Sequence, residues 1–305
     1  MSQSNRFKRK KTFRNTLEGM IPKILLACAF LSIITTFAII FTLLSETVSF
    51  FQEVPFLSFI TGTEWTALFS EAQQQFGILP LVAGTLLITV GAAIVAIPVG
   101  LASAIYLSEF APERVRKVLK PVLEVLAGIP TIVYGYFAIT VITPMLRFFM
   151  PELNFFNALS ASIAVGIMII PMIASLSEDA MRAVPDHIRE AAYGLGSTRL
   201  EVALKIVLPA ALSGVIASFV LALSRAIGET MIVTIAAGAT PNLTANPTET
   251  VQTMTAFMVQ AASGDISFQS IVYKSIYAVG MTLFVFTLVM NLMAQWIARR
   301  FREEY

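Results

Sequence analysis

The chain has 305 residues, of which 56% are hydrophobic and 13% are charged, and its formal net charge at pH 7 is +2. With a mean hydropathy of +0.78, it has too few polar residues to cover a large soluble core, so an ordinary soluble domain is excluded. One histidine and one cysteine make a metal site implausible and exclude an internal disulfide. We therefore expect a polytopic membrane protein.

Six apolar runs are long enough to cross a hydrocarbon core of about 30 Å as helices. In chain order they are Ile24–Leu44, Leu79–Leu101, Val122–Thr143, Leu159–Leu176, Ala210–Ala236 and Ile271–Ile297. The first run is longer than the apolar region of a signal peptide, and no convincing cleavage site follows it. The sequence thus predicts an all-α membrane protein with six transmembrane helices.

The distribution of basic residues predicts the orientation in the membrane. Lysine and arginine concentrate in residues 1–23, 114–120, 182–205 and 298–305. The loop at residues 45–77 has four glutamates and no basic residue, and the loop at 238–270 has only two acidic charges. Since basic connections stay on the cytoplasmic side, we expect both termini in the cytoplasm. The basic tail then determines topology, and we expect no nucleic-acid partner.

This pattern divides the chain into two tails, a first helix with its loop, and a compact core. The corresponding residues are 1–23 and 298–305, 24–76, and 77–297. Three apolar runs contain a proline, at Pro98, Pro130 and Pro171, and each removes a backbone donor and favours a bend. These bends are either ordinary kinks or, around Ala127–Pro130, part of a pathway that flexes.

A polar segment at residues 185–209 separates the fourth and fifth runs. Pro185-Asp186 is typical of a helix start, and Thr198–Glu201 has the pattern of a capping box that begins a second helix. Gly194 and Gly196 permit a turn between them. The segment therefore predicts two short helices that meet at a glycine corner on the cytoplasmic side.

Apolar residues recur at helical spacing on the first of these short helices. They are Ile188, Ala191, Ala192 and Leu195. An exposed apolar stripe of this kind fits a groove on a partner protein, or rests on lipid headgroups as an interfacial hairpin. Spacing alone leaves both interpretations open.

The fifth run contains two opposite charges four residues apart, Arg225 and Glu229. At about 1.5 Å per residue from Pro209, Arg225 lies roughly 24 Å along a continuous helix, well inside the bilayer. A central arginine costs about 2.5–3.5 kcal/mol to insert, so it must face protein or water. We expect a buried ion pair on one helix face. It is either a structural salt bridge or a site where the guanidinium binds a tetrahedral oxyanion.

Several stretches together resemble one transporter family. Residues 190–209 keep the full pattern E-A-A-x3-G-x9-I-x-L-P, which resembles the cytoplasmic coupling loop of permease subunits in bacterial ABC importers, so 185–209 is named the coupling segment. Four further stretches carry the resemblance to this family: Ala127–Gly135, Ser175–Ala180, Arg225–Met231 and Ala236–Gly238. From about Gly77 to Asn291 the chain is similar to the phosphate-importer permease family of the PstC type.

The resemblance implies a type I (MetI-like) importer permease fold with cytoplasmic coupling helices, in a bacterial inner membrane. It implies assembly with a sister permease, two ATP-binding subunits and an extracytoplasmic phosphate-binding protein. The chain has no phosphate-loop motif, so ATP and Mg²⁺ belong to the partner ATPases; we expect no catalytic residue and no cofactor in this chain. By resemblance, the coupling contact comprises Glu190, Ala191, Ala192 and Gly196, and the substrate pathway comprises Arg225, Glu229 and Thr230.

Three alternatives remain at this point. A permease for sulfate or molybdate shares the same coupling pattern. An ion-coupled secondary transporter requires no ATPase partner. An intramembrane hydrolase is the poorest fit, because the only histidine, His187, lies in the coupling segment and cannot pair with a serine at membrane depth.

Overall fold

The computed structural model describes residues 13–264, 266–267 and 270–300; the rest of the two expected tails lies outside this set. The first part of the chain forms α1 (Phe13–Glu53), α2 (Phe56–Thr61), η1 (Glu71–Gln73), α3 (Leu79–Ile105), η2 (Tyr106–Phe110), α4 (Glu113–Ala127), α5 (Thr131–Phe137), η3 (Ala138–Ile142) and α6 (Thr143–Phe149). The second part forms α7 (Ala158–Arg182), α8 (Asp186–Gly194), α9 (Arg199–Glu201), η4 (Val202–Val207), α10 (Leu208–Ala210), α11 (Leu212–Ile227), α12 (Met231–Ala236), α13 (Met254–Ser263) and α14 (Ile271–Arg300). One isolated bridge joins Trp65 to Phe76, and the described ranges contain no strand. The all-α prediction is confirmed.

Five helical segments are long and apolar enough to cross a bilayer. They are Met20–Glu53, Leu79–Phe110, Thr131–Phe149, Ala158–Arg182 and Ile271–Ile297. A sixth span is obtained if Arg199–Ala210 and Leu212–Ile227, which are bent by 74° against each other, count as one. The described part of the chain therefore has the five or six spans of a multi-pass membrane protein.

The third span does not follow the expected bounds Val122–Thr143. It begins at Thr131, because α4 ends at Ala127 and the non-helical Pro130 (φ −56°, ψ 134°) stands as the N-cap of a new helix, α5. The residues before this break form α4, a separate helix with no buried side chain, whose exposed surface includes Val122 and Val125. The expected run combined the apolar face of α4 with the true span.

The fifth run was expected as one helix over Ala210–Ala236, and this is wrong at both ends. The chain bends at Ala211 (φ −88°, ψ 3°), and α11 ends at Ile227. Gly228 (φ −85°, ψ 0°) follows, and helix resumes only at Met231 as α12. The backbone is thus interrupted inside the expected membrane region, which is tolerated where surrounding protein satisfies its polar groups.

The core is built on α3 and α7, which pack along each other. A Cβ on Gly91 would lie 2.6 Å from the Ser162 hydroxyl, and one on Gly100 would lie 2.7 Å from Ile173. Both distances are shorter than real contacts, so only glycine permits this approach. Close packing of small residues is what associates helices in a membrane, where the lipid is as apolar as the side chains.

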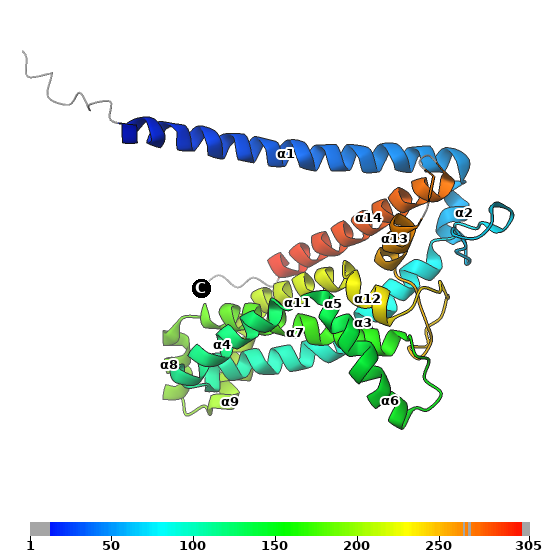
Figure 1. Ribbon diagram of the computed structural model, residues 1–305. Coiled ribbons are helices and arrows are strands. Elements are labelled where there is room, and N and C mark those ends of the chain that lie inside the picture. The colour runs from blue at the N-terminus through cyan, green and yellow to red at the C-terminus, as the bar shows by residue number, and fades with distance from the viewer. Residues whose placement is uncertain (1–12, 265, 268–269, 301–305) are drawn as a thin grey trace, which may run out of the picture.

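Helix α1 is peripheral, as expected from the sequence. None of its most apolar 18-residue window is buried. Its described contacts lie near its C-terminal end, where Thr47 Oγ1 donates to the Tyr277 carbonyl at 3.1 Å and Glu53 pairs with Lys274 in α14. Figure 1 shows α1 diverging from α14 beyond this region.

The two ends of the bundle carry different structures. The short helices α8 and α9 gather at one end, and α2 and α13 lie at the other (Figure 1). The start of α1 and the end of α14 lie toward the α8 end. The coupling segment is therefore far from the loops that follow α2 and α12.

Candidate functional site

The coupling segment folds as its sequence predicts. Helix α8 follows Pro185, and Gly196 takes the left-handed conformation (φ +88°) at the corner. Thr198 Oγ1 accepts from the Glu201 N–H at 3.4 Å, and Glu201 Oε2 accepts from the Thr198 N–H at 3.0 Å. The glycine corner and the capping box are confirmed, and the second helix continues as the π-helical turn η4.

The capping glutamate is strongly acidic. Hydrogen bonds from the Thr198 backbone N–H and then its hydroxyl lower the pKa of Glu201, and Lys205 Nζ at 3.2 Å lowers it further, to about 2. Glu201 is therefore ionised at neutral pH, where its charge favours the first turn of the helix.

The expected apolar stripe of α8 does not form a single exposed face. Glu190, Ala191 and Gly196 are exposed, and the Leu195 side chain is 89% exposed. Ala192 is 6% exposed and belongs to a core cluster with residues of α7, η4 and α11. Three of the four expected coupling residues thus lie on the outer side, while Ala192 holds α8 against the bundle.

A buried carboxylate joins α4 to α7 next to the coupling segment. Glu178 is fully buried, and its oxygens accept from Arg116 Nε at 2.7 Å and from Lys120 Nζ at 2.9 Å. Burial opposes protonation of Lys120, but its hydrogen bonds to Asp179 and Glu178 outweigh this and raise its pKa. Residues 175–180 belong to the family resemblance, but the pairing of Glu178 with α4 was not predicted; the four-residue spacing of Arg116 and Lys120 was the available signal.

The expected ion pair between Arg225 and Glu229 is not formed. Arg225, near the end of α11, is exposed, and it makes no ion pair among the described residues. Glu229 is 8% exposed, and its Oε1 accepts from the backbone N–H groups of Met231 and Ile232 at 3.0 and 3.2 Å. The helix break between the two residues removes the four-residue spacing on one face, so the prediction of a buried pair is wrong.

The backbone at this break is held by threonines. The Thr255 hydroxyl, from α13, donates to the Glu229 carbonyl at 2.7 Å, and Thr234 Oγ1 donates to the Thr230 carbonyl at 2.6 Å. The Thr230 hydroxyl donates to the Gly228 carbonyl at 3.2 Å. The three expected pathway residues therefore surround one fixed interruption, with Arg225 outermost.

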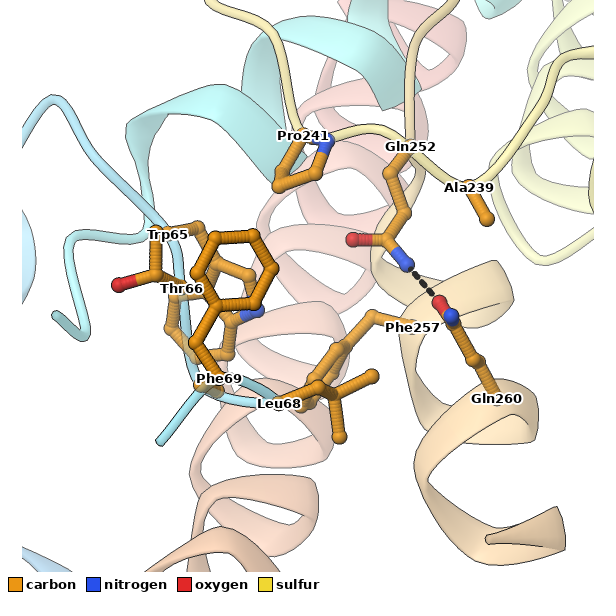
Figure 2. Close-up of a pocket in the computed structure, with 10 residues that line it drawn as sticks. Trp65, Thr66, Leu68, Phe69, Ala239, Pro241, Gln252, Phe257 and Gln260 are labelled. Atoms are coloured by element: carbon orange, nitrogen blue, oxygen red, sulfur yellow. Dashed lines mark hydrogen bonds between the residues drawn. The ribbon is translucent and has the colours of Figure 1, made fainter. Parts of the chain in front are cut away.

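A small pocket lies at the opposite end of the bundle from the coupling segment, and Figure 2 shows its lining. It encloses about 60 Å³ between the loop after α2 and the loop after α12. Gln252 Nε2 donates to Gln260 Oε1 at 2.5 Å on one side, and Trp65 packs edge-to-face on Phe257 on the other. A space of this size holds only a few water molecules, and it shares no residue with the helix break.

Known proteins are similar to this chain in sequence and architecture. Residues 96–303 match the family model described as "binding-protein-dependent transport system inner membrane component". The chain belongs to this family. It is also 32% identical over 302 residues to the probable ABC transporter permease protein YqgH of Bacillus subtilis, covering 98% of this chain and 97% of that protein.

Two further proteins align with most of the chain. A phosphate transport system permease protein PstC of Mesorhizobium japonicum is 32% identical over 265 residues, covering 80% of this chain and 78% of that protein. The crystal structure of a bacterial alginate ABC transporter contains a chain that superposes with a TM-score of 0.64 at 17% identity, covering 93% of this chain and 96% of that one. The fold of this family member is that of an ABC importer permease, as the resemblance implied.

Proposed function

We propose that this family member is the PstC-type permease subunit of an ABC importer that carries inorganic phosphate. The observation that supports this most directly is the state of Arg225, an exposed arginine of the apolar helix α11 without an ion-pair partner among the described residues. Its neighbour Glu229 is engaged by two backbone N–H groups, so the guanidinium charge is available to an anion.

The chemistry of that guanidinium suits a tetrahedral oxyanion. An arginine at membrane depth faces protein or a water-filled cavity, and its planar fork of donors binds two oxygens of one anion. Sulfate and molybdate share this geometry. Phosphate is favoured because named phosphate permeases are among the relatives that align with most of this chain. Arg225, Glu229 and Thr230 are the proposed pathway residues.

The same proposal assigns the remaining roles to partners. A sister permease completes the pathway, two ATP-binding subunits dock on the coupling segment, and an extracytoplasmic phosphate-binding protein delivers the anion. ATP and Mg²⁺ are bound by the ATP-binding subunits, and this chain supplies no catalytic residue and binds no cofactor. The protein lies in a bacterial inner membrane, and both of its termini are on the cytoplasmic side.

The test is uptake of labelled phosphate by cells that express the complete importer, with Arg225→Ala, Arg225→Lys and native chain compared at equal membrane levels. We expect Arg225→Ala to lower uptake by about tenfold or more, and Arg225→Lys to retain part of it, because an ammonium keeps the charge without the fork. Arg114→Ala is the matched control, since Arg114 is exposed on α4, away from the break.

Two results would contradict the proposal in different ways. If Arg225→Ala takes up phosphate at the rate of the native chain, Arg225 is not a pathway residue. Full competition by sulfate or molybdate against labelled phosphate leaves an oxyanion importer but makes phosphate the wrong substrate.

A further inference from the structure

A partly buried arginine lies beneath the exposed face of the coupling segment. Arg189 precedes Glu190 in α8, and its side chain is only 14% exposed. Its guanidinium donates from Nη1 to the Val184 carbonyl at 2.5 Å and from Nη2 to the Met181 carbonyl at 2.8 Å. These carbonyls lie at the C-terminal end of α7 and just beyond it, where helix carbonyls lack the usual partner four residues on; that of Met181 also accepts from the Val184 N–H at 3.3 Å.

The same guanidinium also reaches the end of α3. Arg189 Nη2 lies 3.2 Å from Glu109 Oε1, and Nε lies 3.4 Å from the same oxygen. Glu109 belongs to η2, which continues α3 directly, and its side chain is 4% exposed. The Ser108 hydroxyl donates to that oxygen at 2.8 Å. One side chain of α8 is therefore bonded to the ends of both α3 and α7.

Stability alone is a poor reason for this arrangement. Removing two charged groups from water offsets much of their attraction, so a buried ion pair is a weak source of stability compared with an apolar contact of equal volume. The additional contact of Arg189 with Asp186 involves a carboxylate side chain that is 90% exposed, and such pairs contribute little. What the pair does supply is a fixed geometry, because the guanidinium is planar and its donors point in set directions.

Arg189 connects the elements through which a displacement of α8 would spread into the bundle. Helices α3 and α7 pack along each other at the centre of the core. The outer side of α8 carries the exposed Glu190 and Ala191. A force on that outer side reaches the core through Ala192 and Ile188, whose apolar contacts are non-directional, and through Arg189, whose hydrogen bonds are directional.

We propose that Arg189 is the positioning residue that links α8 to the ends of α3 and α7, so that movement of the coupling segment is passed to both core helices together. Glu109 is its counterpart on α3. This inference rests on the proposed function only in requiring ATP-driven transport; it does not depend on which anion is carried.

The test uses the complete importer reconstituted in liposomes, with transport and ATP hydrolysis measured in the same sample. Arg189→Lys and Glu109→Gln are the main variants, because each preserves most of the side-chain volume, and Arg189→Ala is the more drastic change. We expect ATP hydrolysis to persist while the amount of substrate moved per ATP falls by about tenfold in Arg189→Lys. Arg114→Ala, an exposed arginine of α4, should leave that ratio unchanged.

A second readout separates transmission from folding. ATP should alter amide hydrogen exchange in both α8 and η2 of the native importer. In Arg189→Lys and Glu109→Gln, the change in α8 should remain and the change in η2 should disappear. Equal falls in hydrolysis and transport, or an unaltered response of η2, would overturn the proposal. If Arg225→Ala transports normally, the phosphate assignment fails, but the ratio measured in the Arg189 variants still decides this inference.

Discussion

The Oε1 atom of Glu178 in α7 lies 2.7 Å from Nε of Arg116 in α4, although 62 residues separate them in the chain. Lys120 approaches the other carboxylate oxygen at 2.9 Å. The two basic side chains are 20% and 25% exposed, and that of Glu178 is 1% exposed. This pairing is the principal polar attachment of α4, whose own side chains are otherwise unburied.

Replacing that carboxylate should loosen α4. Glu178→Gln leaves two partly buried cations without their shared charge, and removing one partner of a buried pair costs about 3 kcal/mol. We expect the thermal midpoint of the purified importer to fall by several degrees, and trypsin to cleave after Arg116 and Lys117 in α4 more rapidly.

The matched control is Glu113→Gln. Glu113 pairs with Lys117 on the same helix at 3.9 Å, and both side chains are more than two-thirds exposed (71% and 75%). An exposed pair of this kind contributes roughly 0–1 kcal/mol, so its loss should leave the midpoint nearly unchanged. Equal shifts in the two variants would show that the Glu178 network does not hold α4.

The glycine corner allows a test in which only the backbone differs. A Cβ at Gly194 or at Gly196 would meet no atom within 4 Å, yet only Gly196 has a positive φ, of +88°. Gly196→Ala should therefore strain the corner by about 1–2 kcal/mol, whereas Gly194→Ala, within α8, should be neutral or stabilising by about 0.5–1 kcal/mol.

The measurement is amide exchange across residues 186–207, together with transport by the assembled importer. Faster exchange and weaker transport are expected for Gly196→Ala alone. The same response from both alanine variants would mean that side-chain volume at a docked surface, and not backbone strain, limits the segment.

The capping box should respond to acid in a predictable direction. The pKa of Glu201 is lowered from 4.5 to about 2 by Thr198 and then by Lys205. Its contribution to the helix is therefore complete above about pH 4.5 and is lost as the pH falls toward about 2. Amide exchange of residues 199–207, corrected for intrinsic rates, should be slow at about pH 6 and accelerate below about pH 4.

In Glu201→Gln the acid-dependent increase in amide exchange should be absent, since no carboxylate titrates at that position. Thr198→Ala removes the hydroxyl bond but keeps the backbone N–H bond, so it should move the transition only part of the way toward the ordinary carboxylate pKa. A transition that persists unchanged in both variants would assign the acid response to another group.

Local features of this chain could be predicted from the sequence. The capping box Thr198–Glu201 and the turn at Gly196 involve residues a few positions apart, so their residue types determine the geometry directly. The apolar runs also located most membrane spans, because length and hydropathy decide which helices a bilayer accepts.

The errors arose where a pattern was assumed to continue. Val122 to Thr143 is apolar apart from Glu124, but its first part belongs to α4, where Val122 and Val125 are exposed, and hydropathy does not distinguish such an exposed face from a span. The pairing of Arg225 with Glu229 assumed a continuous helix, and Gly228 ends it. The contact between Arg189 and Glu109 crosses 80 residues, and a single sequence carries no signal for it.

The break after α11 yields a last prediction, on Glu229. Its carboxylate satisfies the N–H groups of Met231 and Ile232, and a buried donor left without a partner costs about 1–3 kcal/mol. Glu229→Gln keeps an acceptor oxygen at that position and should assemble normally; Glu229→Leu removes the acceptor and should lower the thermal midpoint. If the charge of Glu229 also balances Arg225 during transport, Glu229→Gln will bind phosphate more tightly and release it more slowly. The release rate of phosphate in a single turnover of the reconstituted importer measures this. If Glu229→Gln releases phosphate at the native rate, the role of Glu229 is only to bind the backbone N–H groups.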